Sequence, residues 1–448
     1  MLRECPGRSA MVVMRGGRGK GDLMGRFSFP MAPGRAEALG EIHARPFALV
    51  GKSRVIFQLA FLTDGGAVVD HAVLAELART RGVAVPGRDA AHFAMAWGQG
   101  TLRWERHSEF STYFWDAPTP AQFGDKVETH PFGDQFSPPG SMISGIRLEV
   151  RAHSEETTAA LESFDPTSLC MSEVKGGQAV IATDFRQDGD GLTRILVIDK
   201  GMTDAGRGAV VQRLLDIETY RTLAALGLSL ARSLSPEMRR IEDSLTKITQ
   251  AMKNGARENA DSLLAEITVL AAELEANAAL SLYRFGASRA YYTIVRERIA
   301  SLDETQQPGF ETIGAFLEKR LAPAMRTCQS IEERQANLSR KLSRATALLR
   351  SWIDVELERQ NSALLSSMNR RVKLQLRMQQ TVEGLSVAAI SYYIVGLFGY
   401  LAKPLEGLGL PIKSGQASAL FVPVAIGFTW MVVRSIRKNH DVEDRAGD

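Results

Sequence analysis

Two charge-free stretches near the C-terminus decide how this chain is organised. The first runs from Gly384 to Ala402 as GLSVAAISYYIVGLFGYLA, and the second runs from Ser414 to Val433 as SGQASALFVPVAIGFTWMVV. Each is about the 20 residues that a helix needs to cross a hydrocarbon core of about 30 Å. A charged residue at mid-bilayer costs about 2.5 kcal/mol or more, so two such stretches in succession predict a transmembrane helical hairpin.

The basic residues around these stretches predict which side of the membrane they face. The connecting loop from Lys403 to Lys413 is short and carries Glu406 against its two lysines. Lysine and arginine collect on the cytoplasmic side of membrane proteins, so both termini are predicted to be cytoplasmic, with the lipid bilayer as a partner. The alternative is a buried helical hairpin of a soluble protein. The flanking basic residues are Arg370, Arg371, Lys373, Arg377, Arg434, Arg437 and Lys438.

Composition restricts the remaining possibilities. The chain has 448 residues, enough for two or three domains, and its formal net charge of +3 argues against a nucleic-acid partner. Cys5, Cys170 and Cys328 lie far apart, without the spacing of a zinc site or of a disulfide framework. We therefore expect no metal ion and no other cofactor.

The part of the chain before residue 204 divides into a leader and an α/β domain. Residues 1–35 are rich in glycine and arginine, and we expect them to be disordered. Short strand and helix patterns follow in residues 36–203, and Gln187–Gly191 has the composition of a hairpin turn. These patterns predict a mostly antiparallel α/β domain within a chain of the α+β class. Strands are expected at 55–62, 102–106, 109–115, 142–151, 169–174, 178–185 and 192–198, and helices at 68–81 and 154–163.

Two polar clusters in this domain are candidates for chemistry, one from Glu41 to Phe47 and the other from Trp104 to Glu109. An acid, a base and a histidine together can serve general acid–base catalysis or bind an anion. They can also form a salt-linked polar face on a strand. We prefer this interpretation and predict that the protein is not an enzyme, because no nucleophile–base–orienter set is visible. The candidate residues are His43, Arg45, Glu105, Arg106 and His107.

Residues 204–383 carry a helical pattern that predicts a long coiled-coil stalk. Ser235-Pro236 is expected to start a new helix, because serine caps helices and proline suits their first turn. From Ile331 to Trp352, selected side chains recur at alternating spacings of four and three residues. A helix from about Ala324 to Ala402 would be roughly 120 Å long and must pack along its length. The arm from Ser235 to Ser301 is expected to supply one partner, and copies of the chain the others, which predicts a homo-oligomer.

In the predicted hairpin of residues 384–433, small and polar side chains share one face of the first span, and this face starts just before the span. This face lines a conduit for cations, or it packs against Gly427 and Thr429 of the second stretch. We prefer the packing interpretation and keep a cation as the alternative partner. Residues 434–448 are expected to form a basic cytoplasmic tail. The face comprises Gln379, Glu383, Ser386, Tyr393, Gly396 and Tyr400.

Four stretches resemble a family of predicted membrane-anchored bacterial proteins that is defined by a domain of unknown function. They are Glu41–Phe47, Arg106–Tyr113, Val211–Tyr220 and Gln379–Tyr393, and the resemblance covers nearly everything after the leader. It implies a multi-pass protein of the bacterial cytoplasmic membrane and no established activity.

The order of the predicted segments is similar to that of CorA-type magnesium channels. These have a cytoplasmic α/β domain, long helices, a helix that continues into the first span, a short outer loop and a basic C-terminus. Their Gly-Met-Asn selectivity motif is absent, and Gly399-Tyr400-Leu401 stands in its place. Our first hypothesis is therefore a structural or regulatory membrane protein. The second is a CorA-like cation transporter with altered selectivity, and the third is a membrane-tethered enzyme.

Overall fold

The described residues of the chain form two compact units. The first unit combines the chain up to Pro236 with Asn277–Arg334, and the second combines Glu237–Ala276 with the chain from Gln335 onward. Most of the predicted leader, and the segment that holds His43 and Arg45, lie outside the described residues. The computed structural model describes residues 32–35, 49–63, 66–88, 90–255, 259–406 and 414–443.

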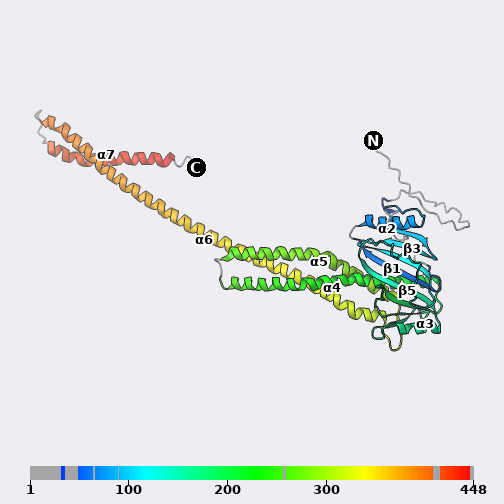
Figure 1. Cartoon of the computed structure of the whole chain (residues 1–448). Coiled ribbons are helices and arrows are strands. Elements are labelled where there is room, and N and C mark those ends of the chain that lie inside the picture. Colours follow the sequence, from blue (N-terminus) through cyan, green and yellow to red (C-terminus); the bar gives the residue numbers. More distant parts are fainter. Residues whose placement is uncertain are drawn as a thin grey trace, which may run out of the picture. The chain divides into compact units, whose positions relative to one another are not determined.

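A nine-stranded sheet is the frame of the first unit (Figure 1). Its strand order is β2-β3-β4-β1-β5-β8-β7-β6-β9, and every neighbouring pair is antiparallel except β5 and β8. The prediction of a mostly antiparallel sheet is therefore confirmed. The strands are β1 (Arg54–Leu62), β2 (His92–Trp97), β3 (Gly100–Arg106), β4 (Phe110–Pro118), β5 (Met142–Ala152), β6 (Cys170–Val174), β7 (Ala179–Thr183), β8 (Thr193–Asp199) and β9 (Thr305–Gln306).

Two strands have no counterpart in the sequence-based prediction. β2 is a six-residue strand at one end of the sheet, and of its side chains the structure buries Met95 alone, so its apolar pattern is weak. Gly98, with a φ of 61°, makes the tight turn from β2 to β3 and is the local signal for this hairpin. β9 has two residues, too few for a sequence pattern, and pairs with β6 at one end of the sheet.

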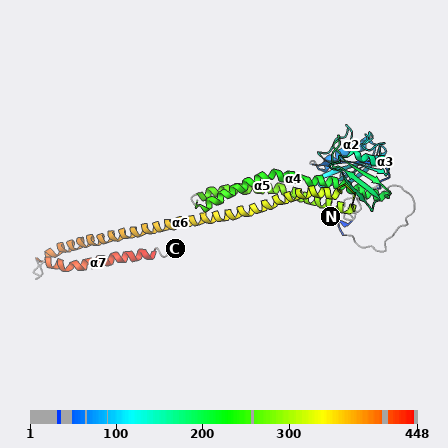
Figure 2. The ribbon, with the colours of Figure 1, turned by 90° about the horizontal axis from the view of Figure 1, so that it is seen from below.

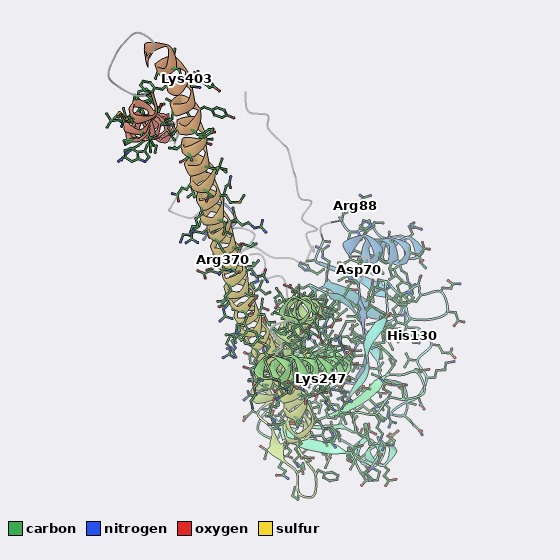
Figure 3. The ribbon with its side chains drawn as sticks, turned by 90° about the vertical axis from the view of Figure 1, so that its left-hand side faces the viewer. Asp70, Arg88, His130, Lys247, Arg370 and Lys403 are labelled. Carbon is green, nitrogen blue, oxygen red and sulfur yellow. The ribbon has the colours of Figure 1, made fainter. Side chains whose placement is uncertain are left out.

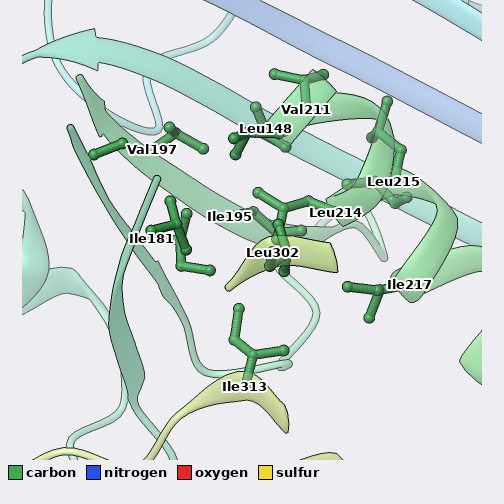
Figure 4. Close-up of a cluster of buried hydrophobic side chains, with 14 of the residues drawn as sticks. Leu148, Ile181, Ile195, Val197, Val211, Leu214, Leu215, Ile217, Leu302 and Ile313 are labelled. Atoms are coloured by element: carbon green, nitrogen blue, oxygen red, sulfur yellow. The ribbon is translucent and has the colours of Figure 1, made fainter. Parts of the chain in front are cut away.

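Helices cover both faces of the sheet. α2 (Ala67–Thr80) packs over one face, where Leu74 and Leu77 meet a core of side chains from β1, β3 and β4. α4 (Asp204–Lys253) packs over the other face. Because side chains alternate along a strand, Phe57 of β1 belongs to the first core and Ile56 to the second. Figure 4 labels Leu148, Ile181, Ile195, Val197, Val211, Leu214, Leu215, Ile217, Leu302 and Ile313 of the second core.

The prediction of a helix start at Ser235-Pro236 is wrong, because α4 continues through Pro236. Proline has no N–H for the preceding turn and clashes with it, which costs about 3 kcal/mol or more inside a helix. On either side of the proline, Leu234 is buried in a cluster of the first unit and Met238 in a cluster of the second. Each such burial stabilises by about 1.5–3 kcal/mol, and together the two offset the loss.

A turn divides the predicted arm from Ser235 to Ser301 into two helices, α4 and α5 (Ala260–Leu302). α4 ends just before Gly255, whose φ of 82° is the left-handed conformation that commonly ends helices. Figures 1 and 2 show α4 and α5 side by side, and Arg240 of α4 forms a salt bridge with Glu273 of α5. The arm is therefore a helical hairpin and not one helix.

α6 (Ile313–Glu406) begins before Ala324, the residue predicted for its start. The carboxylate of Glu304 accepts hydrogen bonds from two backbone N–H groups of the first turn, at 3.1 and 2.9 Å, and from the Ser172 hydroxyl at 2.7 Å. A carboxylate there satisfies unpaired N–H groups and complements the helix dipole. Glu304 lies nine residues before Ile313, so no local sequence pattern reveals this cap. With 94 residues, α6 is roughly 140 Å long.

A core of three helices holds the second unit together. Leu338, Leu342 and Leu349 of α6 are buried there with side chains from α4 and α5. These three leucines belong to the series with alternating spacings of four and three, so this part of the series packs within the chain. Every side chain from residue 354 to residue 382 of α6 is exposed.

α7 (Ser414–Glu443) turns back beside the C-terminal end of α6. The rings of Phe398 and Phe421 stack with centroids 4.1 Å apart, which joins the two helices. Both helices are long and apolar enough to cross a membrane. Their apolar windows are 6% and 11% buried, so neither window forms part of an apolar core in the described part of the chain.

Candidate functional site

The predicted cluster from Trp104 to Glu109 is divided between the two faces of the sheet. Side chains alternate along β3, so Glu105 and His107 line a cavity on the α4 side. Arg106 follows the opposite alternation, and its charge acts on Asp70 of α2. The cluster is therefore not one catalytic constellation. It contributes two of its members to a site that other elements complete.

The cavity lies between strands β1–β4 and helices α4 and α5, entirely within the first unit. Its volume is about 650 Å³, which is within the range of sites that hold small molecules. The sheet supplies mainly the side chains that do not pack under α2. The sheet residues are Gln58, His92, Phe93, Ala94, Arg103, Trp104, Glu105, His107, Phe110, Thr112 and Phe114, and the helices add Gln212, Arg213, Asp216, Thr219, Tyr220, Arg298 and Ser301.

Hydrogen bonds hold the walls of the cavity together. The Asp216 carboxylate of α4 accepts from Nε of Arg298 on α5 at 2.7 Å and from Nε2 of Gln212 at 2.8 Å. Buried Gln58 of β1 donates from Nε2 to Oγ1 of Thr219 on α4 at 3.0 Å. The sheet, α4 and α5 are thus joined around the cavity, and its shape is set by the fold.

Two arginines of the lining have no ion-pair partner among the described residues. The Arg103 guanidinium lies 5.2 Å from the ring centre of Phe114. Nη1 of Arg213 is buried and has no hydrogen-bond partner in the described part of the chain. A buried polar group without a partner is costly to the fold, so the second arginine requires an explanation.

Aromatic rings give the cavity an apolar side. The His107 ring stacks on Phe110 with centroids 4.2 Å apart and planes 10° from parallel. Phe110 meets Tyr220 of α4 edge to face, and Tyr220 stacks on Tyr291 of α5 at 5.4 Å. Together with Phe114, these rings can cover the apolar body of a ligand. The cavity therefore combines guanidinium donors, amide and hydroxyl groups and aromatic walls, as binding sites do.

Glu109, the last residue of the predicted cluster, fastens the turn between β3 and β4 to α5. Its carboxylate accepts a hydrogen bond from Nη2 of Arg284 at 2.7 Å and another from the hydroxyl of Tyr291. Burial and the carboxylate together raise the pKa of Tyr291, so the phenol stays protonated as the donor. Glu109 thus positions the aromatic wall.

A buried charged triad on β5 has no counterpart in the sequence-based prediction. Glu149 is fully buried, and each of its carboxylate oxygens lies 2.7 Å from a guanidinium nitrogen, one of Arg147 and one of Arg151. The guanidinium groups also donate to carbonyls of the loop from Pro120 to Asp125, which binds this loop to the sheet. The alternation Arg-x-Glu-x-Arg in a strand is the signal for such a triad.

Two thiols and one carboxylate outside the cavity have raised pKa values because they are buried. Burial raises the pKa of Cys170 to about 12 and also raises that of Cys328, so both stay protonated and poorly nucleophilic. Burial likewise raises the pKa of Asp70, although it accepts hydrogen bonds from the hydroxyls of Ser111 at 2.6 Å and Tyr113 at 3.3 Å. Figure 3 labels Asp70 beside the sheet, where these bonds fix α2 to β4.

The face predicted on the first apolar stretch lies partly away from α7. Tyr393 and Tyr400 are 70% and 76% exposed, whereas Ser391 of α6 and Thr429 of α7 are buried. Because α6 and α7 meet elsewhere, α7 does not cover these two tyrosines in the described part of the chain.

Glu383 and Ser386 belong to the same predicted face, near the beginning of the apolar stretch. The Glu383 carboxylate accepts a hydrogen bond from Gln379 at 3.4 Å, and Ser386 is exposed. Whether this face lines a conduit or packs against another helix stays a prediction.

These features define an α+β protein with a mostly antiparallel sheet, long helices and two apolar helices at its C-terminal end. The chain belongs to the family described as "Protein of unknown function (DUF3422)", whose model matches residues 30–440. The predicted resemblance to a family defined by a domain of unknown function is confirmed, and the match includes the sheet, the cavity and both apolar helices. A comparison with curated proteins found no match.

Proposed function

We propose that this protein is a membrane-anchored homo-oligomer with a structural or regulatory role, and that its α/β domain faces the cytoplasm. The observation that carries the proposal is the uncovered apolar surface of α6 and α7, where Leu385 is 73% and Leu420 is 81% exposed. Apolar surface of this extent marks a site of membrane or protein interaction. A bilayer is the partner that covers helices of this length on all sides.

The residues at the end of the second apolar stretch support a membrane boundary there. The Arg434 guanidinium lies 4.8 Å from the ring centre of Trp430. Tryptophan and basic residues are typical of the interface between a membrane and the cytoplasm. The basic residues from Arg370 to Arg377, before the first stretch, likewise support a cytoplasmic boundary, and the proposed topology therefore has both ends of the hairpin on the cytoplasmic side.

The exposed segment of α6 from residue 354 to residue 382 supports association between copies of the chain. Leu365, Met368 and Val372 lie on it at spacings of three and four residues, and all three are exposed. A second copy of the same segment would bury these side chains in a coiled coil. The proposed oligomer therefore assembles through this segment, beyond the three-helix core of each chain.

Deletion of residues 384–448 is expected to move the protein from the membrane fraction to the soluble fraction, because both apolar stretches are lost. The measurement is fractionation followed by an alkaline wash of the membranes. Deletion of residues 439–448 is the matched control, since it keeps both stretches and should leave the protein in the membrane. If the larger deletion remained in the washed membranes, the proposed anchor would be wrong.

A cation conduit is the second candidate function, and the exposure of Tyr393 and Tyr400 favours it. In an oligomer, Glu383 from each copy would form a ring at the mouth of the conduit, and such a ring attracts cations. Glu383→Lys is expected to abolish cation flux into liposomes without dissociating the oligomer. Glu266→Lys is the matched control, since Glu266 is exposed on α5 and lies outside both the apolar stretch and the segment proposed for assembly, and it should leave the flux unchanged. If the wild type passes no magnesium, cobalt, potassium or sodium ions, the conduit is excluded.

A further inference from the structure

We propose that the cavity between β1–β4 and helices α4 and α5 binds a small organic anion with an aromatic or other apolar body. The carboxylate or phosphate of this ligand is held by the guanidinium groups of Arg213 and Arg103. The proposal concerns the first unit alone, so it stands or falls independently of the membrane anchor.

The environment of Arg213 is the first step of the argument. Arg213 and Asp216 are three residues apart on α4, a spacing at which opposite charges commonly pair. The Asp216 carboxylate instead accepts from Arg298 and Gln212, and Nη1 of Arg213 is left buried without a partner among the described residues. A planar guanidinium presents paired donors that match a carboxylate or a phosphate, so such a group would satisfy it.

The charge balance of the lining agrees with an anionic ligand. Asp216 and Arg298 form a salt bridge at 2.7 Å and neutralise one another. Arg103 and Arg213 then face a single acidic side chain of the lining, Glu105. The excess positive charge disfavours a metal cation and favours an anion.

The size and the aromatic walls of the cavity specify the rest of the ligand. A volume of about 650 Å³ is far larger than an inorganic phosphate needs. Phe110, Phe114 and Tyr220 line it and offer ring faces and edges to an apolar body. Thr112 and the Gln58–Thr219 pair add hydrogen-bonding groups. An aryl carboxylate or an aryl phosphate could pair its anionic group with the guanidinium groups and pack its ring against the aromatic side chains.

The experiment uses the full-length protein in lipid nanodiscs and four probes: phenylacetate, phenyl phosphate, inorganic phosphate and neutral phenylacetamide. Thermal unfolding followed by tryptophan fluorescence, together with calorimetric titration, measures binding. Phenylacetate or phenyl phosphate is expected to raise the unfolding midpoint in a saturable way, whereas phenylacetamide should not. The aryl anion that binds better identifies whether a carboxylate or a phosphate is preferred.

Variants of two arginines on α4 connect this binding to the cavity. Arg213→Gln is expected to weaken binding of the aryl anion at least tenfold, because it removes the guanidinium fork. Arg232→Gln is the matched control, since Arg232 is exposed on the same helix and does not line the cavity. It should bind as the wild type does.

The ligand-free variants give a readout that does not depend on the choice of probe. Arg213→Gln without ligand is expected to unfold at a higher temperature than the wild type, because it removes a guanidinium whose buried Nη1 has no hydrogen-bond partner among the described residues. A lower midpoint would show that Arg213 stabilises the empty fold, and it would overturn the proposal. Failure of both aryl anions to bind, equal binding of phenylacetamide, or undiminished binding to Arg213→Gln would also overturn it.

Discussion

Replacement of Glu149 by glutamine is expected to destabilise the α/β domain by about 3–5 kcal/mol. The Glu149 side chain is fully buried between those of Arg147 and Arg151, which are 8% and 10% exposed. Glutamine keeps the shape of the side chain but leaves two buried positive charges without a counter-charge. Removal of one partner from a buried ion pair is costly for this reason. Urea unfolding followed by near-ultraviolet circular dichroism measures the change.

Glu173→Gln is the matched control for this prediction. Glu173 of β6 also pairs with a basic side chain, Lys200, at 2.7 Å, but both side chains are about one-third exposed. Exposed ion pairs contribute little because water solvates the separated charges, so this variant should unfold close to the wild type. Equal, small losses for Glu149→Gln and Glu173→Gln would show that the triad does not hold the loop from Pro120 to Asp125 to the sheet.

Leu342→Ala is expected to destabilise the three-helix core of the second unit by about 2–5 kcal/mol. Leu342 is 1% exposed and packs in a cluster with Leu338, Leu349 and side chains of α4 and α5. Alanine would leave a cavity that neighbouring helices fill only in part. Chemical unfolding monitored through the fluorescence of Trp352, which packs against this cluster, measures the effect.

Two variants further along α6 separate stability of this core from assembly of the oligomer. Leu364→Ala should leave stability nearly unchanged, because Leu364 is 61% exposed. Met368→Glu should lower the oligomeric mass measured by light scattering, because the proposed coiled coil would bury Met368, and it should leave the Leu342 core intact. A monomeric wild type in mild detergent would contradict the oligomer.

The sheet was predictable because its strands carry their own signals. Val55 to Leu62 is apolar except for Gln58, since β1 lies inside the sheet with a core on each face. The Ser154 cap of α3 (Glu155–Ala159) was predictable for the same reason, because a serine side chain and the Thr157 N–H that it accepts from are local neighbours.

The helix boundaries were not predictable, because contacts distant in the sequence decide them. The Ser235-Pro236 signal is locally valid, yet buried leucine and methionine side chains on both sides of the proline outweigh it. The start of α6 depends on Glu304 and on Ser172 of β6, which lie 132 residues apart in the sequence. Local propensity is a weak guide wherever tertiary packing opposes it.

The candidate site was predictable in part. Glu105 and His107 stood out because polar residues are concentrated around them, and the structure places both in the lining of the cavity. Arg106 does not lie with them, since strand alternation sends it to the opposite face of the sheet. Arg213 was not predicted as a site residue, because a single arginine in an amphipathic helix usually lies in solvent. Arg213 is partly exposed, and its Nη1 is buried because α4 packs against the sheet.

The discontinuity of the first unit has a consequence for biosynthesis. All strands but β9 precede Asp204, yet Leu302, at the end of α5, and Ile313 and Leu321 of α6 belong to the same core and are made only as or after the α4–α5 hairpin is completed. A nascent chain that stops within this hairpin therefore exposes the apolar face of the sheet, as incomplete domains do during synthesis. Residues 335–383 follow the completed domain and precede the first apolar stretch. The ribosome therefore synthesises every residue of the first unit before either of the two apolar stretches that are proposed to enter the membrane.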